Sequence, residues 1–151
     1  MKANQSHKLS SLVVSKSNLP KYDVALPPFA IKKKTLANLA IDAIIDLGLD
    51  ELEFWLIQDN TAKAKAKIIQ QPRGYKLEIV SNTPTDIDKK VAFVALLGQI
   101  SSRSIQIKHK IDISMLDFDN IKLIHQDKIV ATAKMAMSED RVVLVITEVI
   151  L

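Results

Sequence analysis

The sequence predicts an α+β domain in which two helices pack on a mainly antiparallel sheet of about six or seven strands. Two stretches carry apolar residues at helical spacing, and several shorter runs alternate apolar with polar residues or are rich in β-branched residues. The links between consecutive runs are short, which favours antiparallel pairing because parallel strands need long crossovers. The predicted order is an N-terminal arm, a helix, three strands, a second helix and four strands.

Residues 1–34 are predicted to form an extended basic arm ahead of a single α+β domain at residues 35–151. Seven lysines and one aspartate give the arm a net charge of +6, whereas the rest of the chain carries −2. The prolines at positions 20, 27 and 28 exclude a continuous helix. Such a localised positive charge attracts phosphate groups, anionic membranes or acidic protein surfaces.

The arm also contains apolar residues that favour docking, on a partner or on the chain's own sheet. Residues 11–15 are suited to add as a strand to a sheet edge, either of the same chain or of a neighbour. The candidate partner-docking residues are Leu12, Val13, Val14, Leu26 and Phe29.

Two helices are predicted, at residues 35–47 and 85–100. The first has an apolar stripe, with Thr35 as its N-cap and Gly48 as its left-handed stop. The second opens with two aspartates, which favour the N-terminal end of a helix dipole, and ends near Gly98. Both begin near a threonine and end near a Leu-Gly pair, so a duplicated αβββ unit is an open alternative. The stripe of the first helix comprises Leu36, Leu39, Ala40, Ala43, Ile44 and Leu47.

Seven strands are predicted around these helices, with tight turns at residues 71–74, 126–127 and 138–140. The last strand is apolar on both faces, which is typical of a strand in the interior of a sheet. The predicted strands are residues 52–56, 62–70, 75–80, 104–114, 121–125, 129–137 and 141–151.

The composition is that of an ordinary globular domain, with 48% apolar and 25% charged residues. The absence of cysteine excludes disulfides and thiolate metal sites. The longest apolar run, residues 91–98, is far shorter than the roughly 20 residues of a membrane-spanning helix. We therefore expect an intracellular, cytoplasmic protein without a membrane span.

Residues that could support catalysis are few. His109 and His125 are predicted on inward faces of neighbouring strands, where they either meet to bind a metal or shuttle a proton, or each bond to the backbone. Residues 117–120 offer clustered oxygen ligands but lack the spacing of a calcium loop, so a plain turn is the preferred interpretation. There is no nucleophile motif and no glycine-rich phosphate loop. We expect no enzymatic activity, no metal and no cofactor.

Two lysine clusters are candidate anion or phosphate sites. Lys32, Lys33 and Lys34 precede Thr35 at the start of the first predicted helix, where backbone N–H groups also attract anions. Lys63, Lys65 and Lys67 recur along one face of a strand at roughly 6.8 Å, a spacing that could follow a nucleic-acid backbone. The alternatives are a solvated lysine run for the first cluster and protection of an edge strand for the second.

The sequence favours a non-enzymatic interaction or assembly module, a structural protein that self-associates or binds a protein partner through its N-terminal arm and its sheet. A homo-oligomer is expected. The alternative is a nucleic-acid-binding protein that contacts the phosphate backbone through its lysine clusters. Aromatic residues are only 5% of the chain, which counts against binding by base stacking.

Overall fold

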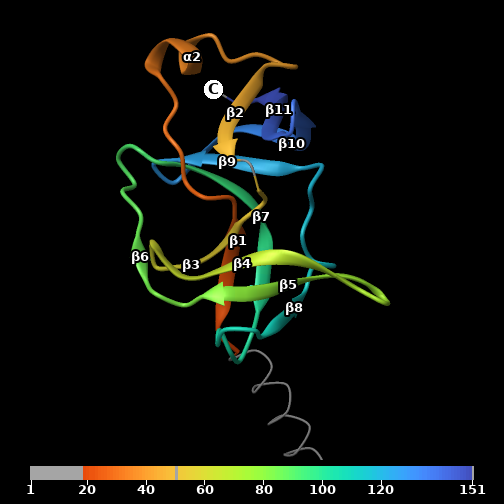
Figure 1. The fold of residues 1–151 in the computed structure, drawn as a ribbon. Helices are drawn as coiled ribbons and strands as arrows, with labels where there is room; N and C mark the ends of the chain where they lie inside the picture. Colours follow the sequence, from red (N-terminus) through yellow and green to blue (C-terminus); the bar gives the residue numbers. More distant parts are fainter. Residues whose placement is uncertain (1–18, 50, 151) are drawn as a thin grey trace, which may run out of the picture.

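The computed structural model describes residues 19–49 and 51–150, and within them the chain forms eleven strands of one antiparallel sheet and one short helix (Figure 1). The helix, α2, is Lys33–Ala37. The strands are β1 Lys21–Ala25, β2 Ile44–Leu49, β3 Phe54–Gln58, β4 Thr61–Gln71, β5 Gly74–Ser81, β6 Thr85–Asp86, β7 Phe93–Ser101, β8 Lys110–Asp112, β9 Ile121–His125, β10 Lys128–Ser138 and β11 Arg141–Val149.

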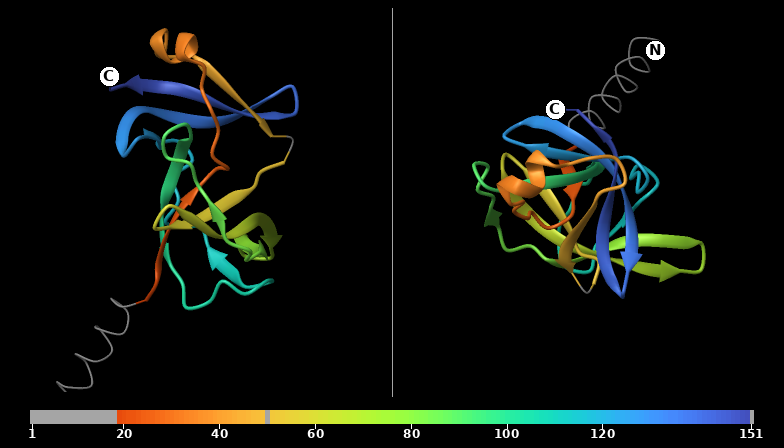
Figure 2. Two further views of the ribbon diagram at one scale, coloured as in Figure 1. Left: turned by 90° about the vertical axis from the view of Figure 1, so that its left-hand side faces the viewer. Right: turned by 90° about the horizontal axis from the view of Figure 1, so that it is seen from above.

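The sheet follows the strand order β2-β11-β10-β9-β7-β1-β3-β4-β5-β8, and β6 pairs with β4 outside this path. It curls so strongly that β2, β9, β10 and β11 form one half of the molecule, while β1, β3, β4, β5 and β8 form the other (Figures 1 and 2). The long strand β7 joins the halves, because it pairs with β9 near its start and with β1 towards its end.

The main hydrophobic core runs through both halves and is lined by the inner face of the curled sheet, and a small second cluster consists of Ala25, Ile57 and Ala62. Alternate residues of the strands face it, as a side-chain period of two requires. Fully buried side chains come from interior strands in both halves; the largest are Phe54, Leu26, Leu56, Leu77, Ile79, Ile121, Leu123, Leu144, Ile146, Val24 and Val142.

The α+β prediction is wrong. The structure is 57% strand and 4% helix, and no helix in the described part of the chain reaches seven residues. Residues 19–49 and 51–150 therefore contain no pair of packed helices. The alternative of a duplicated αβββ unit, which needs both helices, is also wrong.

The first predicted helix is replaced by one helical turn followed by strand β2. Helix α2 ends at Ala37 with Asn38 as its C-cap, and Asp42 adopts a left-handed backbone conformation (φ 69°), which a continuous helix over residues 35–47 could not contain. Gly48 is also left-handed (φ 71°), but it lies at an irregularity in the pairing of β2 with β11 and ends no helix. The stripe that predicted a helix is only partly buried: Leu36, Leu39, Ala43 and Leu47 pack against the core, whereas Ala40 and Ile44 are exposed.

The second predicted helix is strand β7, preceded by the two-residue strand β6. Residues 91–98 are almost all apolar, so their pattern fits a helical period and a strand period equally well. The structure shows the period of two, with Phe93, Ala95 and Leu97 at 3% exposure or less. Asp88 accepts a hydrogen bond from the backbone N–H of Lys90 at 3.0 Å, which stabilises a turn before β7.

Gly98 allows another backbone segment to pack closely against β7. A Cβ at this position would lie 2.7 Å from the backbone oxygen of Met115. The segment that contains Met115 packs against β7, because Asp117 donates its N–H to the C=O of Leu97. We expect Gly98→Ala to lower the free energy of unfolding by about 1–3 kcal/mol, because backbone must move to admit the methyl group. Denaturant unfolding measures this change, with Gln99→Ala on the neighbouring exposed residue as the control. Equal stability of Gly98→Ala and the wild type would refute the close approach.

Most of the predicted strands are confirmed, including β3, β4, β5, β9, β10 and β11 with the turns that join β4 to β5, β9 to β10 and β10 to β11. Strand β11 lies between β10 and β2, and both Val142 and Val143 are buried, as predicted for an interior strand.

The predicted strand 104–114 is wrong except for β8. Side chains of Ser102 and Ser104 bond to nearby backbone there, and Lys108 has a φ of 76°, so local turns replace the ladder.

The part of the expected arm that the structure describes is built into the domain. Strand β1 lies between β7 and β3, and its Val24 and Ala25 are fully buried. Among the described residues, α2 is the only helix, and it lacks the length and hydropathy needed to cross a bilayer.

Candidate functional site

Among residues 19–49 and 51–150, the path of the sheet ends at two strands, β2 and β8, and each pairs with a neighbour along one edge only. Strand β8 has three residues, and charged Lys110 and Asp112 flank its single apolar residue. Strand β2 has six residues, and β11 is the only strand or helix beside it in the described part of the chain. Short length and charge are the usual protection of a sheet edge, so β8 is protected and β2 is the more open end.

The hydrogen bonds of β11 show which backbone groups of β2 are left free. Ile146 donates its N–H to Ala43 C=O at 2.9 Å and accepts from Asp42 N–H at 2.8 Å. Alternate residues of a strand face the same neighbour, so the pair of Leu144 and Ile45 is also hydrogen-bonded. The N–H and C=O groups of the residues on either side of Ile45, which are Ile44 and Asp46, therefore point away from β11 toward the open edge.

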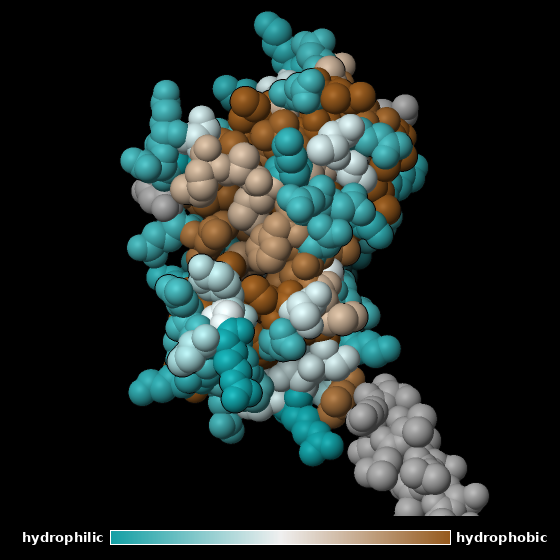
Figure 3. Space-filling view, turned by 90° about the vertical axis from the view of Figure 1, so that its right-hand side faces the viewer, coloured by the Kyte–Doolittle hydropathy of each residue, from teal (hydrophilic) through white to brown (hydrophobic). Residues whose placement is uncertain are grey.

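Exposed isoleucines accompany this edge. Ile41 is 63% exposed and Ile44 is 62% exposed, whereas Ile45 on the inner face is 8% exposed. Figure 3 shows hydrophobic side chains gathered over the upper half of the molecule, the half that contains β2, β10 and β11. Free backbone groups beside exposed apolar side chains form a surface on which an additional strand can pair.

The edge is acidic as well as apolar. Residues 38–49 contain two charged residues, Asp42 and Asp46, and no lysine or arginine. Asp46 forms an ion pair with Arg141 on β11 at 3.3 Å, and both side chains are about half exposed. Asp46 also accepts a hydrogen bond from Gly48 N–H at 2.8 Å, which fixes the irregular end of β2. The regular part of the free edge is therefore the first half of β2, before the irregularity that follows Asp46.

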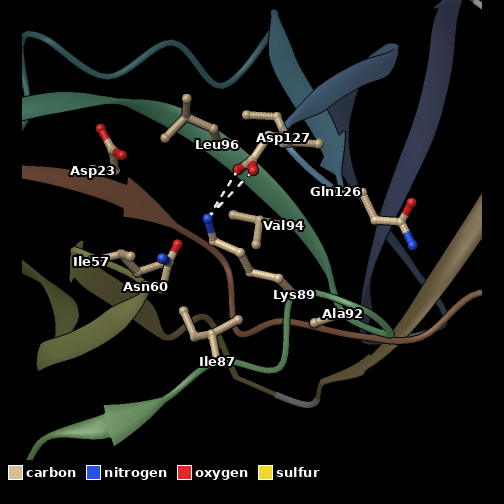
Figure 4. Close-up of a pocket in the computed structure, with 11 residues that line it drawn as sticks. Asp23, Ile57, Asn60, Ile87, Lys89, Ala92, Val94, Leu96, Gln126 and Asp127 are labelled. Carbon is tan, nitrogen blue, oxygen red and sulfur yellow. Dashed lines mark hydrogen bonds and ion pairs between the residues drawn. The ribbon is translucent and has the colours of Figure 1, made fainter.

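A pocket of about 160 Å³ lies on the opposite, outer face of the sheet (Figure 4). Figure 4 shows Lys89 reaching across it to Asp127, with its Nζ at 3.2 and 3.4 Å from the two carboxylate oxygens. Aliphatic side chains of β3, β7 and β9 form much of the lining. The residues around the pocket are Asp23, Ile57, Asn60, Ile87, Lys89, Ala92, Val94, Leu96, Ile124, Gln126 and Asp127.

This pocket is too small for a nucleotide or a comparable cofactor, since such ligands occupy sites of roughly 300–1,000 Å³. A volume near 150 Å³ holds about one benzene ring. Its polar groups are largely paired with one another: Lys89 with Asp127, and the amide of Gln126 with Lys90 C=O at 3.4 Å. No pair of nucleophile and base lines it, so its geometry supports no particular reaction.

The two histidines do not meet, because they contact opposite ends of β7. His125 stacks on Phe93 with 4.0 Å between ring centroids, and its Nδ1 lies 3.2 Å from Ala92 C=O. His109 Nε2 lies 3.3 Å from the hydroxyl oxygen of Ser102, which donates its own proton to a backbone oxygen at 2.7 Å. The hydroxyl group of Ser102 is thus shared between the backbone of its own turn and the ring of His109, an arrangement that holds this turn.

The lysine row on β4 is largely occupied by contacts within the chain. Lys65 Nζ lies 4.5 Å from the centroid of the Trp55 ring, a cation–π contact. Lys67 forms an ion pair with Glu51 at 3.0 Å; that hydrogen bond, and then the attraction of the same carboxylate, raises the pKa of Lys67. Lys63 lies where the pairing of β4 with β3 shifts register. Strand β4 lies between β3 and β5, so the interpretation of these lysines as protection of an edge strand is wrong.

The other lysine cluster lies on the surface around α2. Lys32 is the N-cap, Lys33 and Lys34 open the helix, and all three are exposed. Thr35 lies inside the helix, and no side chain caps its start, so the predicted capping role of Thr35 is wrong. A helix of five residues adds little dipole to attract an anion.

The predicted docking residues fall into two groups. Leu26 is fully buried and donates its N–H to Ala95 C=O, while Phe29 pairs with Phe93 and stacks on its ring at 6.3 Å. Both pack on the chain's own sheet. Leu12, Val13 and Val14 lie outside the described residues.

The acidic loop at residues 117–120 contains a local turn. Asp117 accepts a hydrogen bond from the N–H of Asp119 at 3.0 Å, as expected for the plain-turn interpretation. The sequence did not reveal the open edge at Ile41 and Ile44, because both residues fall in the stretch that predicted a helix. The adjacent β-branched pair Ile44-Ile45 was the one local signal for a strand.

No model of a known protein family and no curated protein matches this chain. Its function is therefore inferred from its own residues.

Proposed function

We propose that this protein is a non-enzymatic interaction module that binds a protein strand along the open edge of β2. The supporting observation is the outward direction of the backbone groups of Ile44 and Asp46 beside two exposed isoleucines. Main-chain hydrogen bonds would provide affinity, and the side chain of Ile44 would pack against the added strand. The pairing extends a sheet whose other end, β8, is short and charged.

Phosphate-backbone binding has less support. Lys65 and Lys67 are engaged by Trp55 and Glu51, which leaves the row on β4 without three free ammonium groups. The lysines around α2 are exposed, and none of them lines the pocket of Figure 4.

We expect Ile44→Pro to abolish strand binding while the domain stays folded. Proline removes an N–H that points away from β11, and proline is tolerated on edge strands for this reason. The wild type and the variant are each used to select from a displayed library of short random peptides. The wild type should enrich β-prone peptides, and Ile44→Pro should enrich none of them.

Ile44→Thr is the matched control, because it keeps the N–H and the strand propensity at the same position. It should retain the peptides selected by the wild type, with weaker binding from the lost apolar contact. Equal enrichment by the wild type and Ile44→Pro would overturn the proposed function.

A further inference from the structure

We infer that the strand received by β2 is residues 11–15 of a second copy of this chain, so that molecules associate head to tail. This inference rests on the proposed function of the β2 edge. It adds the identity of the partner and the direction of assembly.

Charge and sequence make the two surfaces complementary. Residues 11–15 read Ser-Leu-Val-Val-Ser, a short β-prone run between Lys8 and Lys16. The first 18 residues carry three lysines and no acidic residue, whereas residues 38–49 carry two aspartates and no basic residue. Arg141 of β11 already pairs with Asp46, so the acidic character of the edge rests on Asp42, and pairing β2 with the β2 of a second molecule would add a second Asp42 to it. The basic segment is therefore the better match for the acidic edge.

The distance between β1 and β2 identifies the donor as another molecule. Residues 15–21 can span at most about 20 Å when fully extended. Strand β1 and strand β2 are separated in the sheet by four strands, β7, β9, β10 and β11. Lys21, where β1 begins, pairs with Ser101 at the end of β7 that is remote from β9, and Figure 1 shows β2 at the opposite end of the molecule. The link from residue 15 to the start of β1 is thus too short for segment 11–15 to reach the β2 of its own chain.

The test uses two full-length variants that damage one side of the contact each. Val13→Pro combined with Val14→Pro damages the donor segment in either register, and Ile44→Pro damages the acceptor edge. We expect the wild type to form species larger than 16.8 kDa at rising concentration and each variant alone to remain at 16.8 kDa. An equimolar mixture of the two variants should form a one-to-one dimer, because each supplies the side that the other lacks. Light scattering measures these masses.

Matched controls separate the contact from general effects of proline. Ala3→Pro introduces proline in the same N-terminal segment outside residues 11–15, and it should assemble like the wild type. Ile44→Thr should also assemble. If a proline variant unfolds on heating earlier than the wild type, a synthetic peptide of residues 8–18 replaces it; excess peptide should reduce wild-type assemblies to monomers, and a scrambled peptide should not.

The outcomes distinguish the inference from the proposed function. If the Val13 and Val14 variant assembles like the wild type while Ile44→Pro stays monomeric, the edge binds another strand, and the head-to-tail inference is overturned alone. Monomeric wild type at all concentrations also overturns the inference alone. If both proline variants assemble like the wild type, β2 is not the self-association surface and the inference is overturned, while the peptide selection with Ile44→Pro decides the proposed function.

Discussion

Val24→Asp will prevent the protein from folding. Val24 is fully buried in β1, where it lies opposite Leu56 on one side and Gly98 on the other. A carboxylate at this position has no partner and loses its hydration, a cost of roughly 4–5 kcal/mol or more. That cost is comparable with the whole stability of a typical domain, about 5–15 kcal/mol. Circular dichroism should show loss of the strand signal, together with a loss of soluble protein.

Lys21→Asp is the control for this experiment. It introduces the same side chain in the same strand, but at an exposed position, and should change the free energy of unfolding by less than about 0.5 kcal/mol. If Val24→Asp unfolds at the wild-type temperature, β1 is not part of the sheet. The pair of variants thus separates a strand in the core from an arm on the surface.

Phe54→Ala should lower the free energy of unfolding by about 3–5 kcal/mol. The ring of Phe54 is fully buried and meets the ring of Phe118 edge to face, with 6.1 Å between centroids. Removing it leaves a cavity between β3 and the segment before β9. Equilibrium unfolding in urea measures the change through the midpoint of the transition.

Tyr75→Ala removes an aromatic ring of similar size from a position that is 56% exposed. It should cost less than about 1 kcal/mol, because little buried area is lost. A loss for Phe54→Ala as small as that for Tyr75→Ala would contradict the position of Phe54 in the core.

The strands that sequence reasoning predicted correctly are those with two independent local signals. In β4 and β5, alternation is combined with a turn at Pro72, Arg73 and Gly74. In β10 and β11, alternation or a β-branched run is combined with turn residues such as Glu139 and Asp140, both of which have positive φ. Such pairs of residues suit the tight turns of hairpins, so pattern and turn chemistry agree.

The two helix predictions failed because the apolar pattern was compatible with more than one structure. In β7, Ala95 and Leu97 favour helices intrinsically, but pairing with β1 and β9 overrides this preference. At residues 35–47, the leucines of the stripe are partly buried, but from a helical turn and a strand, and Ile44 of the same stripe is exposed. Which members of the stripe face the core depends on the backbone, which long-range contacts decide.

The candidate site was hidden for the same reason. An open sheet edge is a property of the complete strand order, and β2 is an edge only because β11, at the other end of the sequence, pairs with one of its sides. Exposure of Ile44 beside burial of Ile45 follows from that pairing and from no local signal. Charge was more informative, since the basic and acidic stretches of the proposed contact can be recognised without a structure.

The interior position of β1 also bears on how the protein matures during synthesis. Asp23 and Gln99 contact each other although 76 residues separate them in the chain. At a translation rate of 5–20 residues per second, β1 waits roughly 4–15 s before its neighbour β7 has even been made. The edge of β1 that faces β7 therefore cannot pair during that interval, whereas β3, its other neighbour, is made much sooner.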